Sequence, residues 1–283
     1  MNKKRITGNK TSLLLVAIGV ICIVVAFSGL YGTYKEYKDA KDKYDKVEEE
    51  FVHKIETESE EIPIETETEI IENTESEVQE EAPKRPWYES IWVDLEGLQN
   101  KYAEVVGWLY FENDSISYPL MQTTDNQKYL RMAYDGSYSK AGSIFVETTH
   151  EGDFSEMHTI VYGHNQKDNN MFGRLMNYQK YKWYYENHQY FQVFCEDKIY
   201  RYQIFAYQAV GVDGFIFREV YSSADVLAQR LKENSMINSG IVVEEDDKIV
   251  TLCTCTDDTI DRFIVSAVLV ETYDRTTGTL IQN

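Results

Sequence analysis

The chain has 283 residues with 48 acidic and 28 basic side chains, which gives a formal net charge of −20 at pH 7. Residues 82–283 contain 29 acidic and 18 basic side chains, so this region alone carries a net charge of −11. Because proteins that bind nucleic acids neutralise phosphates with basic surfaces, the charge argues against a nucleic acid partner. The same region is long enough for one domain with a sizeable core.

A basic segment opens the chain, because residues 1–11 contain four basic side chains and no acidic one. Residues 12–30 then form an apolar, charge-free stretch of 19 residues. A membrane-spanning helix needs ~20 such residues, whereas the apolar core of a cleaved signal peptide is about 7–15 residues long. We interpret 12–30 as a transmembrane signal-anchor, with a cleaved signal peptide as the alternative. The basic residues predict a cytoplasmic N-terminus and an extracellular catalytic region in the cell membrane.

Residues 31–81 are interpreted as an extracellular acidic spacer. Between residues 48 and 81 there are 15 glutamates and a single lysine. Such a segment cannot bury enough apolar surface to offset the chain entropy lost on folding. It is either a spacer that lifts the next domain off the membrane or a solvated tail with no other role. In both interpretations it lies outside the fold, so a chain starting near residue 82 is expected to fold and be active.

Short apolar runs follow the acidic segment. The first predicted helix covers residues 94–102, where Leu95, Leu98 and Tyr102 recur at spacings of three and four. Eight runs with strand-like composition follow, with turn residues between them. They cover residues 105–111, 116–121, 142–146, 159–162, 190–195, 199–210, 249–255 and 263–272.

A second helix is predicted at 222–234, just before the strand 249–255. Ser222 and Asp225 form a capping pattern at its start. Its apolar side would consist of Val226, Leu227 and Leu231. Many short strands with few helices favour a mostly antiparallel, closed β-barrel of eight strands with peripheral helices, preceded by the transmembrane helix.

A thiol and a guanidinium stand at the ends of two neighbouring predicted strands. Cys255 ends one strand, Arg262 opens the next, and a polar loop separates them. If the strands pair antiparallel, the two residues lie side by side. Cys255 would then reach the rim of the barrel, whereas Cys253 lies one pleat deeper on the same face. A nearby cation favours the thiolate, which is the nucleophilic form of cysteine.

The remaining cysteines favour inert roles. The Cα atoms of Cys253 and Cys255 should lie ~6.6 Å apart along one strand, at the outer edge of what a disulfide tolerates. A zinc site would need Asp257 or Asp258 as a further ligand, because no second pair of cysteines or histidines has the right spacing. We therefore predict no metal and no cofactor. Cys22 in the apolar span and Cys195 in an aromatic stretch are expected to be inert thiols.

Five histidines compete for the role of general acid and base. Only His164 directly follows a predicted strand, and Gly163 would permit a sharp turn that exposes the imidazole. The others lie in the acidic spacer, in a charged loop or in an aromatic stretch; they are His53, His150, His158 and His188. From the residues alone, a catalytic and a structural role of His164 are equally supported.

The segment Thr251-Leu252-Cys253-Thr254-Cys255 matches the TLxTC signature of sortases, the cysteine transpeptidases that attach proteins to the Gram-positive cell wall. His164 in Tyr162-Gly163-His164-Asn165, and Arg262, fall where that family keeps its other two catalytic residues. Further motifs between about residues 90 and 272 resemble the class B branch, which also carries an extra helix before the catalytic strand. They are Val105-Val106-Gly107-Trp108, Tyr118-Pro119, Asp125-Asn126, Tyr129-Leu130, Ala141-Gly142-Ser143-Ile144-Phe145 and Met171-Phe172-Gly173.

The resemblance implies a site and a reaction. Cys255 would be the nucleophile, His164 the general acid and base, and Arg262 the group that stabilises the oxyanion or the substrate. Thr254, Leu130 and Asn126 would bind substrate. The enzyme would cleave a C-terminal sorting motif after threonine, through a thioester acyl-enzyme, and transfer the protein to a cell-wall amine. Motifs similar to Asn-Pro-x-Thr-Gly/Asn are typical of class B.

The implied partners are secreted proteins with a sorting signal, a peptidoglycan or lipid-linked precursor amine, and the cytoplasmic membrane. A sortase that joins pilins through a lysine is the first alternative. The Asp-Pro-aromatic lid of such enzymes is missing, because Arg85 precedes Pro86-Trp87. The second alternative is a catalytically silent extracellular binding domain, against which the intact set of Cys255, His164 and Arg262 argues.

Overall fold

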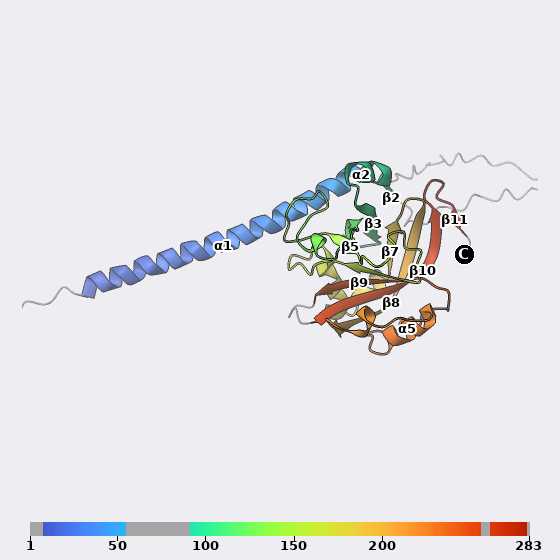
Figure 1. The fold of residues 1–283 in the computed structure, drawn as a ribbon. Helices are drawn as coiled ribbons and strands as arrows, with labels where there is room; N and C mark the ends of the chain where they lie inside the picture. Colours follow the sequence, from blue (N-terminus) through green and yellow to red (C-terminus); the bar gives the residue numbers. More distant parts are fainter. Residues whose placement is uncertain (1–7, 55–90, 256–260, 282–283) are drawn as a thin grey trace, which may run out of the picture.

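The structure, a computed structural model, describes residues 8–54, 91–255 and 261–281 (Figure 1). Its α-helices are α1 (Gly8–Phe51), α2 (Leu95–Lys101), α3 (Asn177–Lys180), α4 (Tyr184–Asn187) and α5 (Ala224–Lys232). Its 3-10 helices are η2 (Lys128–Leu130), η3 (Phe172–Met176) and η4 (Phe215–Phe217). Its strands are β1 (Val52–Lys54), β2 (Ile91–Val93), β3 (Val105–Phe111), β4 (Ser117–Met121), β5 (Ile144–Val146), β6 (His158–Tyr162), β7 (Tyr190–Phe194), β8 (Lys198–Gly211), β9 (Ile249–Cys255), β10 (Asp261–Asp274) and β11 (Leu280–Ile281).

Eight strands close into a barrel. The order around it is β10-β8-β7-β3-β4-β5-β6-β9, and β10 also pairs with β9 to close the ring. The pairs β4–β5 and β6–β9 are parallel, and the other pairs of the ring are antiparallel. The short strand β11 adds to the edge of β10 outside the ring. The predicted eight-stranded, mostly antiparallel barrel is therefore confirmed.

The eight predicted strand runs correspond to the eight strands of the ring. Strands 105–111 and 249–255 have the predicted bounds, and the others end within about two residues of them. The predicted helix 94–102 is α2, in which the Asp94 side chain accepts a hydrogen bond from the Gly97 backbone N–H. The short helices α3 and α4 were not predicted, because four residues are too few to show a periodic apolar pattern.

The predicted helix 222–234 is α5, which covers the outside of the barrel next to β8 (Figure 1). Its buried residues are Ala224, Leu227, Ala228 and Leu231, packed in one cluster with residues of β8, β9 and β10. Val226 does not belong to this face, because 43% of its surface is exposed. The prediction that Val226 belongs to the apolar side of the helix was therefore wrong. The small Ala224 and Ala228 pack against the barrel instead. The observed cap residue is Ser223, whose hydroxyl contacts Asp225, in place of Ser222.

The two faces of β9 belong to two different clusters of buried residues. Val250 and Leu252 pack in the main core inside the barrel. Ile249 and Cys253 pack in the outer cluster beneath α5. Because side chains alternate along a strand, Cys255 lies on the same face as Cys253, at the end of the strand. The predicted placement of both thiols on one face is confirmed.

The helix α1 extends without interruption from Gly8 to Phe51 and leaves the barrel as a long rod (Figure 1). Its C-terminal part packs on the barrel, where Tyr44, Val47 and Phe51 are only 3%, 1% and 5% exposed. This finding differs from the expectation that residues 31–81 lie outside the fold. The reason is that Tyr44, Val47 and Phe51 form an apolar stripe at spacings of three and four. Charged residues stand between them, so the stripe is hard to recognise in the sequence.

The chain continues from α1 into a small sheet that joins it to the domain. Strand β1 pairs antiparallel with β2, with Val52 opposite Val93. The Asp94 N–H also donates to the Phe51 carbonyl, 2.8 Å away. Residues 55–90 lie outside the described residues, so the expectations for most of the acidic spacer and for Pro86-Trp87 are not addressed. The same holds for the loop 256–260 with Asp257 and Asp258.

The N-terminal half of α1 is apolar and exposed. Within the part of the chain that the structure describes, the segment from Leu13 to Phe51 is the one helix long and apolar enough to cross a membrane. Large apolar side chains such as Leu13 and Phe27 lie on its surface with no protein packed against them. A long apolar N-terminal helix of this kind is consistent with a membrane anchor or a signal sequence.

Candidate active site

Cys255 and Arg262 lie directly opposite each other across β9 and β10. The two strands pair antiparallel over seven positions, from this pair to Ile249 opposite Val268. Residues opposite each other in such a pair point to the same face of the sheet. The expectation that strand register brings the thiol beside the guanidinium is confirmed.

Strand β6 brings His164 to the same end of the barrel. β6 runs parallel to β9, and the Gly163 N–H donates to the Cys253 carbonyl at 3.1 Å. Gly163 was expected to permit a sharp turn, but its φ is not positive. Space is what requires glycine here, because a Cβ would lie 2.4 Å from Ile144 Cδ1 and 2.7 Å from the Phe172 ring.

A pocket of about 200 Å³ opens where β6 and β9 end and β10 begins. It brings together all six residues that the sequence analysis selected: Cys255, His164, Arg262, Thr254, Asn126 and Leu130. Phe145, Tyr162, Gly163 and Cys253 complete its lining. The pocket therefore holds a thiol, an imidazole and a guanidinium on one surface, open to solvent.

The His164 ring is oriented by the backbone carbonyl of Leu130, which lies 2.8 Å from Nε2. A carbonyl oxygen can only accept, so Nε2 carries the proton and Nδ1 of the neutral ring keeps its lone pair. Burial lowers the pKa of His164, and the charges of Arg131 and Arg262 act in the same direction, against the hydrogen bond to Leu130. Burial and the two arginines thus favour the neutral form of the imidazole. This orienting group could not be predicted from the residues, because it is a main-chain atom 34 residues away.

The two thiols of β9 have different environments. Cys253 is 1% exposed, and burial raises its pKa to about 12. Cys255 is half-buried and lines the pocket. All four cysteines of the chain lie in the described residues and are free, so Cys253 and Cys255 form no disulfide. Burial also raises the pKa of Cys195 to about 12, in keeping with the predicted inert thiol.

Thr254 presents a buried hydroxyl at the pocket. The residue is 2% exposed, and its Oγ1 has no hydrogen-bond partner among the described residues. Most buried polar groups in proteins are paired, because an unpaired one has lost its water without compensation.

Asn126 reaches the pocket as part of a network around Glu147. Asn126 Nδ2 donates to Glu147 Oε1, and its Oδ1 accepts from the Thr148 N–H at 3.1 Å. The Tyr162 hydroxyl donates to the other carboxylate oxygen of Glu147 at 2.9 Å. Burial raises the pKa of Glu147, but the hydrogen bonds from Asn126, Tyr162 and Thr148 outweigh burial and leave that pKa below its ordinary value. Glu147 is thus ionised at pH 7 and fixes two residues of the pocket wall.

Three residues of this region were missed by sequence reasoning. Tyr162 could have been found, because it ends β6 two positions before His164. Phe145 lies in β5 and Glu147 directly follows that strand. Only the tertiary fold brings Phe145 to the pocket and Glu147 to the side chains of Asn126 and Tyr162. Carboxylates such as Glu147 are common on surfaces, so its sequence position carries no signal.

Comparison with known proteins agrees with this geometry. A family model described as a sortase domain matches residues 112–270. Sortase B of Staphylococcus aureus is 31% identical over 189 residues, which cover 65% of this chain and 77% of that protein. Sortase B of Listeria monocytogenes is 34% identical over 166 residues, which cover 57% of this chain and 67% of that protein.

The fold agrees with a solved structure as well. A substrate complex of Staphylococcus aureus sortase B superposes with a TM-score of 0.57 and 30% identity, over 62% of this chain and 83% of that chain. The residues matched by the family model, 112–270, include Cys255, His164 and Arg262. The chain belongs to the sortase family and is a sortase B-like cysteine transpeptidase.

Proposed function

We propose that this enzyme cleaves a C-terminal sorting signal of secreted proteins after threonine and transfers the acyl group to a peptidoglycan or lipid-linked precursor amine. One observation carries the proposal: the register of β9 and β10 sets Cys255 opposite Arg262 in the pocket that also contains His164. A sortase B from Staphylococcus aureus has been solved with substrate, and its likeness to this chain supports the same substrate class.

The first half of the reaction forms the thioester. His164 Nδ1 takes the proton of the Cys255 thiol, and the sulfur attacks the carbonyl carbon of the threonine. The oxyanion of the tetrahedral intermediate is stabilised by the Arg262 guanidinium, which lies opposite Cys255. The C–N bond then breaks, and the imidazolium gives its proton to the leaving amine.

The second half transfers the acyl group. The amine acceptor attacks the thioester carbonyl, and the neutral His164 accepts the proton that the amine loses. The intermediate collapses, the C–S bond breaks, and the Cys255 sulfur is released to receive a proton. Asn126, Leu130 and Thr254 contact the sorting signal from the pocket wall in this proposal.

The membrane topology is part of the same proposal. The apolar half of α1 anchors the enzyme, and the basic residues before it remain in the cytoplasm. The barrel then lies outside the cell, where sorting signals and cell-wall amines meet.

A peptide library tests the substrate class and the acceptor. We expect the wild type to cleave only peptides with a threonine at the cleavage site, and to join the acyl fragment to amines of the wall-peptide type. Cys255→Ala is the matched control and should give neither hydrolysis nor transfer. Transfer to a pilin lysine peptide in preference to wall-type amines would contradict the proposed acceptor. No cleavage of any library member would contradict the proposed activity.

A further inference from the structure

We propose that Tyr44 of α1 is a positioning residue for His164. Its hydroxyl holds the turn at Gly142 and Ser143, against which the imidazole and the Leu130 carbonyl rest. Helix α1 would then support the active site as well as carry the apolar N-terminal segment. The inference rests on the proposed catalytic role of His164.

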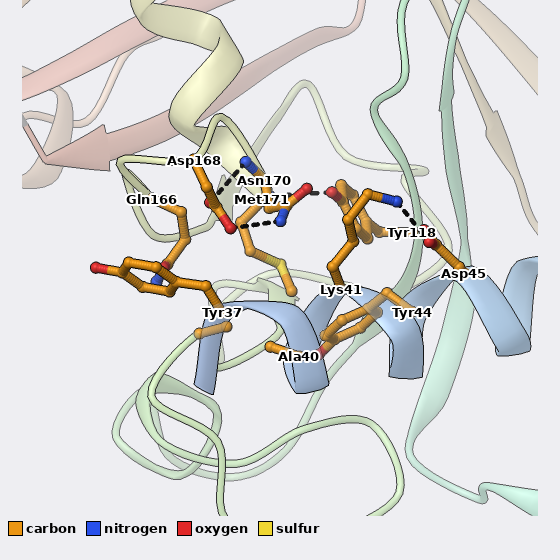
Figure 2. Close-up of a pocket in the computed structure, with 11 residues that line it drawn as sticks. Tyr37, Ala40, Lys41, Tyr44, Asp45, Tyr118, Gln166, Asp168, Asn170 and Met171 are labelled. Atoms are coloured by element: carbon orange, nitrogen blue, oxygen red, sulfur yellow. Dashed lines mark hydrogen bonds and ion pairs between the residues drawn. The ribbon is translucent and has the colours of Figure 1, made fainter. Parts of the chain in front are cut away.

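Tyr44 is inserted into the barrel domain from α1. Its hydroxyl donates to the Gly142 carbonyl at 2.6 Å and lies 3.0 Å from Ser143 Oγ. Tyr44 and its α1 neighbours face Tyr118 and the segment that contains Asn170 and Met171 (Figure 2). These residues line a cavity of about 20 Å³. Burial raises the pKa of Tyr44 well above its ordinary value, so the hydroxyl stays a donor at every working pH.

The turn that Tyr44 holds touches the His164 ring directly. Gly142 has a φ of +61°, and a Cβ there would lie 3.0 Å from His164 Cδ2 and 3.0 Å from the Leu130 carbonyl oxygen. The Ser143 N–H donates to the Tyr129 carbonyl at 2.9 Å, beside Leu130. A shift of this turn would therefore move both the imidazole and the group that orients it.

A second set of contacts connects α1 to the backbone of His164. The Tyr44 ring packs edge-on against Tyr118, with centroids 5.4 Å apart. The Tyr118 hydroxyl accepts from the Met171 N–H at 3.0 Å, and the Phe172 N–H donates to the His164 carbonyl at 3.0 Å. Tyr44 thus supports His164 from both sides. Of the residues that bind substrate in the proposed function, Asn126 and Thr254 take no part in these contacts, and Leu130 takes part through its main-chain carbonyl alone.

The test compares two tyrosines of the same interface in the full chain, kept in detergent micelles. Tyr44→Phe removes the hydroxyl that holds the turn. Tyr134→Phe is the matched control, because its hydroxyl donates to the Lys43 carbonyl at 3.2 Å and so also joins α1 to the barrel without contacting Gly142 or Ser143. Both variants should melt at similar temperatures. We expect kcat to fall by about 10- to 100-fold in Tyr44→Phe, since small misplacements of a catalytic group have effects of that order.

Two readouts separate positioning from stability. The KM for the sorting peptide should stay within about twofold of wild type, because Asn126 and Thr254 are untouched and Leu130 is involved through its main-chain carbonyl alone. In ¹⁵N spectra of labelled histidine, His164 should be the Nε2–H tautomer in wild type and in Tyr134→Phe, and a mixture of tautomers in Tyr44→Phe. Equal kcat values for the two variants, or an unchanged tautomer in Tyr44→Phe, would overturn the inference.

A second variant covers the case in which Tyr44→Phe does not fold. Ser143→Ala removes one contact of the Tyr44 hydroxyl and should lower kcat in the same direction by a smaller factor. Wild-type kcat in Ser143→Ala would equally overturn the inference. Failure of the proposed function looks different, because wild type itself would then form no acyl-enzyme.

Discussion

The rim of β9 and β10 and the surface where α1 packs show two different ways in which a sequence encodes a site. At the rim, Cys255 and Arg262 are close in sequence, and strand register alone sets them side by side. At the α1 surface, Tyr44 is buried against a turn almost 100 residues away. The first arrangement can be read from local pattern, whereas the second depends on the tertiary fold.

The largest expected effect separates the two thiols of the rim. Cys255→Ala should abolish hydrolysis and transfer, because it removes the proposed nucleophile, and burial raises the pKa of Cys253, the other thiol of the pocket, to about 12. Cys253→Ser should fold and retain most of its turnover, since that thiol is buried beneath α5 and takes no part in the reaction. Steady-state kinetics and thermal melts of both variants check this. A loss of activity in Cys253→Ser with an unchanged melt would contradict it.

The next effect concerns the other two proposed catalytic groups. His164→Ala and Arg262→Ala should each lower kcat/KM by about 10²–10⁴-fold, which is typical for the loss of general acid–base or oxyanion-stabilising groups. Arg262→Lys should recover only part of the rate, because an ammonium lacks the planar donor fork of a guanidinium. Near-normal turnover of either alanine variant would remove that residue from the proposed site.

Most of the barrel and the set of pocket residues could be predicted from sequence, because strand alternation and the TLxTC and YGHN motifs are local signals. The orientation of His164 could not, since a backbone carbonyl leaves no mark in a sequence. The role of Gly163 was also out of reach, because it depends on Ile144 and Phe172 packing against it. The stripe of Tyr44, Val47 and Phe51 was concealed by the charges around it.

Truncation tests the α1 surface directly. A chain that starts at residue 82 lacks Tyr44, Val47 and Phe51, so it should melt at a lower temperature and turn over more slowly than one that starts at residue 32. Burying a side chain such as Val47 or Phe51 contributes about 1.5–3 kcal/mol each. The longer chain with Val47→Ala and Phe51→Ala is the control and should lose part of the same stability. Equal melting temperatures and rates for the two starting points would show that α1 is dispensable.

The smallest expected effect is a dependence of the free energy of unfolding on pH that is caused by His158 of β6. Burial lowers the pKa of His158 to about 3, and its Nε2 lies 3.0 Å from Thr251 Oγ1 on β9. The unfolded chain binds a proton below about pH 6.5 and the native protein does not, so stability decreases as the pH falls from there towards about 3. Between pH 7 and pH 5 the free energy of unfolding should decrease by about 2 kcal/mol for this reason. Denaturant titrations should find a smaller decrease over that range in His158→Gln.

The most direct test of the central claim locates the acyl group on wild-type protein, in which both thiols of β9 are present. The full chain is mixed with a sorting peptide, quenched with acid, digested and mapped by tandem mass spectrometry. We expect a thioester on Cys255 that carries the peptide up to its threonine, and an unmodified Cys253. A thioester on Cys253, or a modified residue outside the pocket, would show that Cys255 is not the nucleophile.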